Sequence, residues 1–278
     1  LMPGNKIRKY DTWHAMGQGA TTGSLVVTLE ALKEMHLTPE DIQLIQNDTK
    51  TCPDTGMAGA SRSLYMDGNA TIIAANKLLA AMRKEDGTLR TYDEMKAEGI
   101  ETKYLGRYET NTTPGLCRLD PNTGIGDPTP AFTYCLNLAE VEVDTKTGKT
   151  TVLKFTCVDF VGRIGNIDAV NGQAYSGIMH GIGFALKEDY ADVKKHANMF
   201  GAGTSYIKDV PDDIDLIHID GAISDGPFGS SGASEAFQAS GHCAVLNGIY
   251  NACGVRIHEI PALPEKVKAG LDAIAKGE

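Results

Sequence analysis

The sequence lacks the features that mark membrane-spanning, nucleic-acid-binding and cysteine-ligated metal proteins. No apolar run approaches the ~18 residues that a membrane-spanning helix needs. The 6 cysteines form no CxxC pair and no close cluster with histidine, so the chain shows no zinc or iron–sulfur pattern of its own. Only 26 Lys and Arg stand against 36 Asp and Glu, and the net charge of −10 argues against binding to nucleic acid phosphates.

What remains is typical of a globular protein. The chain has 278 residues, of which 42% are hydrophobic and 22% charged. Its scattered cysteines are expected to be buried, reduced thiols of a cytoplasmic protein. The chain opens on Leu1 without a signal sequence, and we interpret it as a fragment or a processed subunit. The 31 glycines are the one compositional excess, and glycine serves where backbone approaches another group closely.

Hydrophobic periodicity predicts helices and one strand in the first half of the chain. Apolar residues at helical spacing predict helices over residues 19–36 and 61–83, and a short helix over 92–97. A strand is expected over 41–46. Residues 84–127 are rich in Gly, Thr, Asn and charge, which indicates a connecting region.

In the second half of the chain, the spacing of apolar residues changes from helical to alternating. Strict alternation over residues 138–144, a turn at 146–149 and a partner strand over 151–158 predict a β-hairpin. The remaining elements are expected as a helix over 168–186, a strand over 214–219, a helix after Glu235 and a helix from Pro264. The fold class is therefore α+β, with mixed sheets and helices in two similar subdomains, 1–127 and 128–278.

A glycine-rich loop precedes the first helix. It contains Gly17, Gln18, Gly19 and Ala20, although not at GxGxxG spacing. Backbone amides at such a helix entry can cradle a phosphate. The alternative is a tight strand-to-helix turn, in which the glycines have only a conformational role.

A second loop of small residues leads into the next long helix. It contains Gly59, Ala60, Ser61 and Arg62. A hydroxyl and a guanidinium at a helix start suit a phosphate oxygen. The alternative makes Ser61 the N-cap and Arg62 a solvated surface residue.

Two further segments carry polar residues at helix starts. The loop Gly226–Phe237 contains Gly232, Ala233, Ser234 and Glu235. Glu235 is either a general base or a charge at the helix end beside a Ser234 cap. Gln173 begins a helix with several glycines, a pattern that also serves close helix packing.

Taken together, these loops resemble the molybdenum-binding portion of the xanthine oxidase family, and within it the bacterial aldehyde oxidoreductases. The segments that carry the resemblance are Gly17–Ala20, Gly59–Arg62, Met66–Ala70, Gly172–Gln173, Asp225–Gly229, Glu235, Gly254–Ile257 and Leu263–Val267. The similarity covers nearly the whole chain, so it is more specific than any single loop.

The resemblance implies a cofactor and roles for these residues. The cofactor is molybdopterin cytosine dinucleotide, and the molybdenum takes no ligand from a protein side chain. Glu235 corresponds to the base that accepts a proton during oxidation of the substrate. Gln18 and Gln173 correspond to residues that hydrogen-bond the cofactor, and Ser61 with Arg62 to a loop near its phosphates or nucleotide. Gly232, Ala233 and Ser234 belong to the cofactor-binding loop before Glu235.

The resemblance also implies partners that this chain lacks. These are the first molybdenum-binding region, [2Fe-2S] domains and any FAD domain, within a homo-oligomeric enzyme without a nucleic-acid or membrane partner. Ser234 replaces a glycine usual in the family, and Ala236–Phe237 replaces commoner proline-containing pairs. The expected reaction is oxidation of aldehydes to carboxylic acids. Hydroxylation of N-heterocycles such as purines or nicotinate, and a catalytically silent molybdopterin-binding module, stay open as alternatives.

Overall fold

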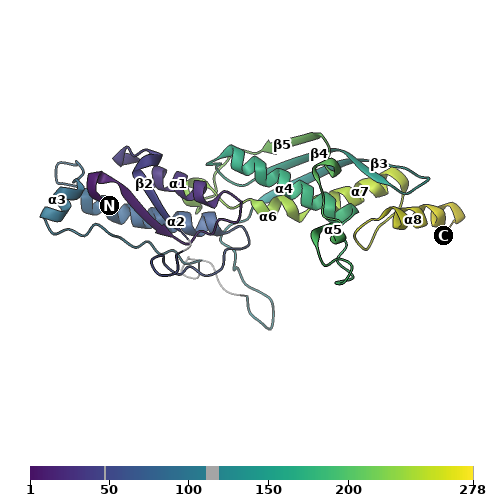
Figure 1. Cartoon of the computed structure of the whole chain (residues 1–278), viewed down its shortest axis with the longest axis horizontal. Helices are drawn as coiled ribbons and strands as arrows, with labels where there is room; N and C mark the ends of the chain where they lie inside the picture. Colours follow the sequence, from purple (N-terminus) through teal and green to yellow (C-terminus); the bar gives the residue numbers. More distant parts are fainter. Residues whose placement is uncertain (47, 111–118, 278) are drawn as a thin grey trace. The chain divides into compact units, whose positions relative to one another are not determined.

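The structure is a computed structural model that describes residues 1–46, 48–110 and 119–277. The chain folds into two compact units, and each unit is built from three separate segments of the sequence (Figure 1). The first unit comprises Leu1–Phe132, Val161–Ile167 and Asp220–Gly232, and the second comprises Thr133–Phe160, Asp168–Ile219 and Ala233–Glu278. The expected subdomains 1–127 and 128–278 concern cofactor binding, and that division stays a prediction.

The first unit contains a small parallel sheet with helices. Its elements are η1 (Pro3–Asn5), β1 (Ile7–Asp11), α1 (Ala20–Ala31), η2 (Lys33–Met35), η3 (Pro39–Asp41), β2 (Ile42–Gln46), α2 (Ser63–Met82), α3 (Tyr92–Ala97) and η6 (Pro227–Gly229). β1 and β2 pair in parallel, from Ile7 opposite Ile42 to Asp11 opposite Gln46. The helices and the β2 strand expected from periodicity are confirmed, whereas β1 was not predicted.

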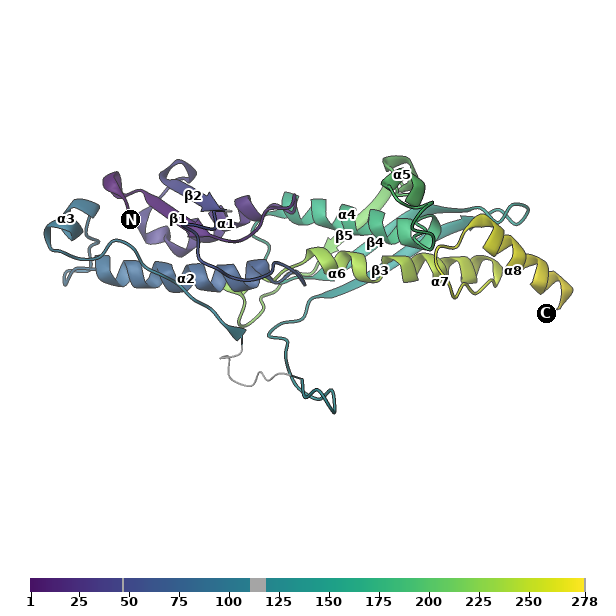
Figure 2. The ribbon, with the colours of Figure 1, turned by 60° about the horizontal axis from the view of Figure 1, so that its bottom comes forward.

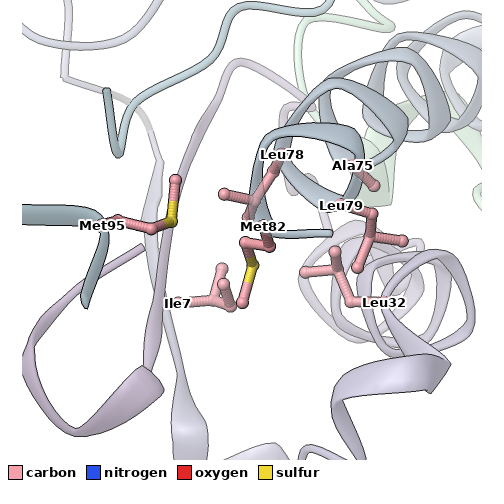
Figure 3. Packing of buried hydrophobic residues seen from close by; sticks show 7 residues of the cluster. All are labelled: Ile7, Leu32, Ala75, Leu78, Leu79, Met82 and Met95. Atoms are coloured by element: carbon pink, nitrogen blue, oxygen red, sulfur yellow. The ribbon is translucent and has the colours of Figure 1, made fainter. Parts of the chain in front are cut away.

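The core of the first unit lies between β1, α1 and α2. Its buried residues are Ile7, Leu32, Ala75, Leu78, Leu79, Met82 and Met95 (Figure 3). Ala75, Leu78, Leu79 and Met82 recur at helical spacing, which confirms the apolar face predicted for α2. α3 starts with a capping box, because Thr91 and Glu94 exchange side-chain to backbone hydrogen bonds.

The second unit is built on a mixed sheet. Its elements are β3 (Tyr134–Val143), β4 (Thr150–Phe160), α4 (Ile167–Leu186), α5 (Met199–Ala202), η5 (Ile207–Asp209), β5 (Asp213–His218), α6 (Ser234–Ala239), α7 (Gly241–Cys253) and α8 (Pro264–Lys276). The strand order is β3-β4-β5, antiparallel between β3 and β4 and parallel between β4 and β5. The predicted hairpin is confirmed, and β3 begins four residues before the alternation that predicted it.

Glycines let the helices of the second unit approach one another and the sheet. A Cβ on Gly181 of α4 would lie 2.9 Å from the Cα of Gly241 at the start of α7. Figure 2 shows α7 running alongside β3, and a Cβ on Gly248 would meet the Val141 methyl at 3.0 Å. The expectation that the glycine-rich face of α4 serves close helix packing is therefore confirmed.

The cysteines differ in burial. Cys157 is buried, Cys52, Cys135 and Cys253 are half-buried, and Cys243 is exposed, all as free thiols. The predicted burial is therefore wrong for Cys243, which the start of α7 holds at the surface. Cys117 lies outside the described residues. None of the described helices is both long and apolar enough to cross a membrane.

Candidate functional site

The loop before α1 leaves the first turn of this helix without a side-chain cap. Gly17 and Gly19 adopt φ angles of +101° and +86°, which favour glycine strongly. Gly19 is the N-cap residue, and it has no side chain to satisfy the first amides of the helix. Thr21 and Thr22 in this turn are exposed. The turn therefore suits an anionic group. The loop connects β1 to α1 through residues 12–19, so it is longer than the tight turn of the alternative interpretation.

Gln18 is held by its own loop. Its Oε1 accepts a hydrogen bond from the Met16 amide at 2.6 Å, and its Nε2 donates to the His14 carbonyl at 2.6 Å. A primary amide has two donor hydrogens and two acceptor lone pairs. Each end of the Gln18 side chain therefore keeps capacity for one further hydrogen bond.

The loop before α2 has an unusual backbone. Ala60 and Ser61 both lie in the left-handed region, with φ of +54° and +51°. This conformation is uncommon outside glycine, and such residues cluster at functional sites. The N-cap position of α2 belongs to Arg62, so the interpretation of Ser61 as the helix cap is wrong. Arg62 is exposed, and its Nη2 donates to the Met57 carbonyl at 2.8 Å.

Gly232 lies directly against this second loop. A Cβ at Gly232 would stand 1.5 Å from the Ser61 carbonyl oxygen, so no other residue fits there without rearrangement. The structure thus brings together two segments that are far apart in the sequence and that the resemblance assigns to cofactor binding.

The segment before Gly232 also packs on α2. A Cβ on Gly68 would lie 2.6 Å from the Pro227 ring, and Asn69 Nδ2 donates to the Asp225 carbonyl at 3.1 Å. Gly68 lies inside α2, where a glycine ordinarily weakens a helix. Here it leaves the space in which the Pro227 ring packs on α2.

A cavity of about 1250 Å³ lies within the first unit. Arg62 lines it, together with Ser63 and Met66 at the start of α2. The other predicted cofactor-binding residues of this unit are not among its lining residues.

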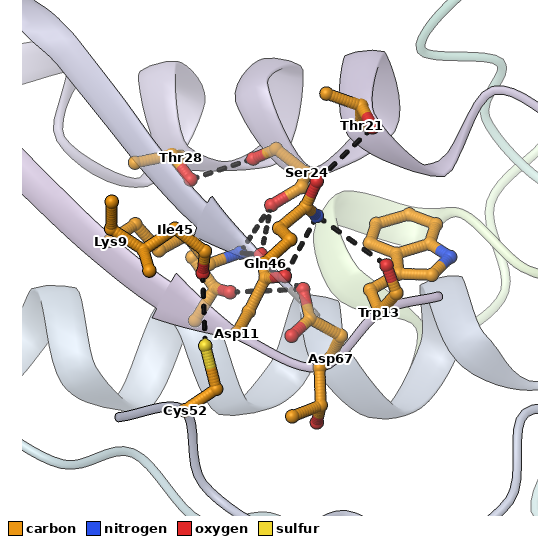
Figure 4. Close-up of polar contacts among 12 residues, drawn as sticks. Lys9, Asp11, Trp13, Thr21, Ser24, Thr28, Ile45, Gln46, Cys52 and Asp67 are labelled. Atoms are coloured by element: carbon orange, nitrogen blue, oxygen red, sulfur yellow. Dashed lines mark hydrogen bonds and ion pairs between the residues drawn. The ribbon is translucent and has the colours of Figure 1, made fainter. Parts of the chain in front are cut away.

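Sequence reasoning missed a buried charge network beside this cavity (Figure 4). Lys9 Nζ donates to Ser24 Oγ at 2.8 Å and to Asp67 Oδ2 at 2.9 Å, and it pairs with Asp11 Oδ2 at 3.1 Å. Gln46 Nε2 donates to the other Asp11 oxygen at 2.8 Å. Burial raises the pKa of Asp67, and the Lys9 ammonium opposes that rise. The sequence feature that could have indicated this network is the spacing of Lys9 and Asp11, which places both side chains on one face of a strand.

In the second unit, α6 presents Glu235 and packs on α4. A Cβ on Gly177 would lie 2.6 Å from the Cβ of Phe237, which is fully buried. Gln173 lies one turn before Gly177 on the same face of α4 and is half-buried. Glu235 is exposed two residues before Phe237. The contact therefore places the segments that carry Gln173 and Glu235 side by side.

The start of α6 differs from the expectation of a Ser234 cap. Ala233 is the N-cap residue, and Ser234 is the first residue of the helix. The capping interpretation of Ser234 is therefore wrong, because the chain enters the helix one residue earlier. Glu235 lies within the first turn of α6.

A family model described as the molybdopterin cofactor-binding domain matches residues 3–211 of the chain. The chain belongs to this family. The resemblance seen in the sequence is therefore confirmed.

The similar proteins include aldehyde oxidoreductases. The aldehyde oxidoreductase of Megalodesulfovibrio gigas is 42% identical over 267 residues, which cover 96% of this chain and 29% of the relative. A crystal structure of the enzyme from Desulfovibrio desulfuricans has a TM-score of 0.91 at 44% identity, over 95% of this chain and 29% of that one. The Desulfovibrio gigas structure has a TM-score of 0.94 at 41% identity, over 98% and 30%. The chain thus spans less than a third of these relatives.

The described residues fit a phosphorylated cofactor of this family. The first turn of α1 offers uncapped amides behind Gly17 and Gly19. Ser61 and Gly232 form a loop pair in which a side chain at Gly232 would occupy the space of the backbone. Across the described residues, no group of three His, Cys, Asp or Glu side chains is placed to hold a metal ion.

Proposed function

We propose that this chain is the molybdopterin-binding portion of a molybdenum hydroxylase that oxidises aldehydes to carboxylic acids with water as the oxygen source. The observation that carries the proposal is the 42% identity to an aldehyde oxidoreductase over 96% of the chain. Because the chain spans 29% of that relative, the reaction itself belongs to a larger enzyme.

Some residues of this chain would bind the cofactor, and Glu235 would take part in proton transfer. Gly17–Ala20 and Gly59–Arg62 would bind phosphate groups through backbone amides and the Arg62 guanidinium. Gln18 and Gln173 would donate and accept hydrogen bonds at the pterin, and Gly232, Ala233 and Ser234 would line its site. Glu235 would accept the proton released in the oxidation, as a positioned carboxylate can. When bound, molybdenum supplies the two-electron redox chemistry.

The cofactor form we propose is molybdopterin cytosine dinucleotide. Two separate loops that suit phosphates, at Gly17–Ala20 and at Gly59–Arg62, support a cofactor with phosphates some distance apart. Acid hydrolysis of the purified holoenzyme should release CMP. Release of no nucleotide would instead indicate the monophosphate pterin, and the dinucleotide proposal would be wrong.

The proposal includes the surroundings of the chain. The missing portions would carry the first molybdenum-binding region, [2Fe-2S] clusters and in some arrangements FAD, in a homo-oligomeric enzyme. We place the enzyme in the cytoplasm, which the free thiols of Cys52, Cys135, Cys157, Cys243 and Cys253 support. The ranges 1–127 and 128–278 would be two similar subdomains of one molybdopterin-binding domain.

Substrate comparison on the holoenzyme tests the function. The enzyme that contains this chain, with its molybdenum content measured, is assayed with an aliphatic aldehyde, an aromatic aldehyde, hypoxanthine and nicotinate. The proposal expects oxidation of the aldehydes, with ¹⁸O from labelled water in the carboxylate. Turnover of the heterocycles alone would favour the N-heterocycle hydroxylase. A full complement of molybdenum with no turnover of any substrate would favour a silent binding module, for which Ser234 beside Glu235 is the motivating departure.

A further inference from the structure

Two cysteines meet on the inner face of the sheet in the second unit. The sulfur atoms of Cys135 on β3 and Cys157 on β4 lie 3.4 Å apart. Cys157 is fully buried and Cys135 is half-buried. In the strand register Cys157 is opposite Asn137, and Cys135 is opposite Asp159, so the two cysteines are diagonal neighbours. Neither thiol has a role in cofactor binding or proton transfer in the proposed reaction.

We propose that Cys135 and Cys157 form an oxidisable dithiol, which hydrogen peroxide closes to a disulfide. The Cys135 sulfur attacks one oxygen of the peroxide and the O–O bond breaks. Cys135 becomes a sulfenic acid, and one water molecule is released. The Cys157 sulfur then attacks the Cys135 sulfur, the S–O bond breaks, and the S–S bond forms with release of a second water. Two thiols are oxidised and one peroxide is reduced to two waters.

The two thiols are unequal in the way that these steps require. Cys135 is the more accessible of the pair, so a small peroxide reaches it first. The hydrogen bond from the Cys157 thiol lowers the pKa of Cys135, which favours the nucleophilic thiolate. The same hydrogen bond and burial raise the pKa of Cys157. Cys157 is thus protected from direct oxidation and lies where a resolving thiol must lie.

The diagonal placement means that closing the bond requires movement of the strand backbone. Diagonal neighbours on antiparallel strands have Cα atoms about 7–8 Å apart, beyond the usual range for an unstrained disulfide. The sulfur atoms must also close from 3.4 Å to about 2.05 Å. Strained disulfides are more easily reduced and are the labile or regulatory ones. The pair is therefore suited to cycle between states rather than to staple the fold.

Oxidation of the pair would change the hydrogen bonds at the end of α6. The Cys135 thiol donates to Asn137 Oδ1 at 3.7 Å, and Asn137 Nδ2 donates to Ser240 Oγ at 2.9 Å. Ser240 is the C-cap residue of α6, directly after the last helical residue Ala239. Formation of the disulfide removes the thiol donor and draws Cys135 towards Cys157. This coupling to the helix does not depend on whether Glu235 is the catalytic base.

Peptide mapping of the enzyme that contains this chain tests the proposal. The enzyme is treated with a few equivalents of hydrogen peroxide, its free thiols are alkylated, and it is digested with trypsin without reduction. Trypsin places Cys135 in peptide 119–146 and Cys157 in peptide 155–163. The expected product is these two peptides joined, lighter than their sum by two hydrogen atoms, and dithiothreitol should return both. Hydrogen exchange should change in residues 234–240 of the oxidised enzyme.

Variants separate this pair from general thiol oxidation. Cys135→Ser should abolish the joined peptide, whereas Cys243→Ser, which removes an exposed thiol, should leave it intact. Sulfinic acid at Cys135 without a joined peptide, or a joined peptide from other cysteines, would overturn the proposal. If Cys135→Ser does not fold, the wild-type digest alone still decides the matter. Unchanged exchange in residues 234–240 would overturn the coupling to α6.

Discussion

Gly232 is packed so closely on Ser61 that the carbonyl oxygen of Ser61 would lie 1.5 Å from a Cβ at position 232. The contact joins the loop before α2 to the segment that precedes α6 in the sequence. In this contact the backbone of Ala60 and Ser61 is left-handed. The loop keeps this conformation against a glycine at position 232, so the two features depend on each other.

The substitution Gly232→Ala should therefore disturb this loop pair. Overpacking of this kind costs about 1–3 kcal/mol, and we expect a lower Tm and a lower molybdenum content in the holoenzyme. Gly165→Ala is the matched control, because its Cβ would make an ordinary contact of 3.5 Å with Val26. Thermal unfolding and metal analysis measure the two effects. Equal Tm and equal molybdenum in both variants would contradict this account of the contact.

The Lys9 network gives a second prediction. Lys9→Met leaves Asp11 and Asp67 buried without their cation, and breaking a buried pair in this way costs about 3–5 kcal/mol. Lys33→Met is the control, since Lys33 pairs with Glu30 at the surface, where such pairs contribute about 0–1 kcal/mol. Denaturant unfolding of both variants measures the difference. Similar losses in the two variants would show that the network contributes no more than a surface ion pair.

The lowered pKa of Glu94 predicts that stability depends on pH. Its hydrogen bonds with Lys84 and Thr91 lower its pKa to about 2 from an ordinary 4.5. A carboxylate with a lowered pKa stabilises the folded state above its ordinary pKa, and this stabilisation is lost as the pH falls through about 2. Glu94→Gln should therefore flatten the fall in unfolding free energy between pH 4.5 and 2.

The Thr91→Ala variant separates the two contributions at this helix start. It removes the N-cap oxygen of α3 at a cost of about 1 kcal/mol. Part of the pH dependence should remain, because Lys84 still pairs with Glu94 at 2.6 Å. Denaturation curves across the pH range give both numbers. A pH profile of Glu94→Gln that matches the wild type would refute the assignment to this carboxylate.

The extent to which the sequence predicted the fold follows from how local each signal was. Helices such as α2 and the hairpin of β3 and β4 were predictable, because their apolar periods repeat over many residues. β1 was missed because Arg8, Lys9 and Asp11 make a five-residue strand look polar. Lys9 and Asp11 are satisfied by partners on α1 and α2, and no local pattern reveals such distant partners.

In the candidate site, too, local features were predictable from the sequence and contacts between distant segments were not. The glycine loops at Gly17 and Gly59 were visible in the sequence, because positive φ and uncapped helix starts depend on neighbouring residues. The contact of Gly232 with Ser61 was not predictable, since it joins segments far apart in the sequence. The assigned helix caps at Ser61 and Ser234 were wrong by one residue, which is the usual uncertainty of a helix end.

Glu235→Gln in the complete enzyme gives the prediction closest to the chemistry. The substitution keeps the size and the hydrogen-bonding capacity of the side chain but removes the carboxylate that accepts a proton. A positioned general base contributes about 10²- to 10⁴-fold, so kcat should fall by that factor while molybdenum content survives. Glu259→Gln, on an exposed carboxylate outside the site, is the matched control and should retain kcat. Steady-state rates with an aldehyde and metal content must come from one preparation. A Glu235→Gln enzyme with full molybdenum and more than about a tenth of the wild-type kcat would leave less than ~1.4 kcal/mol for proton transfer, too little for a base.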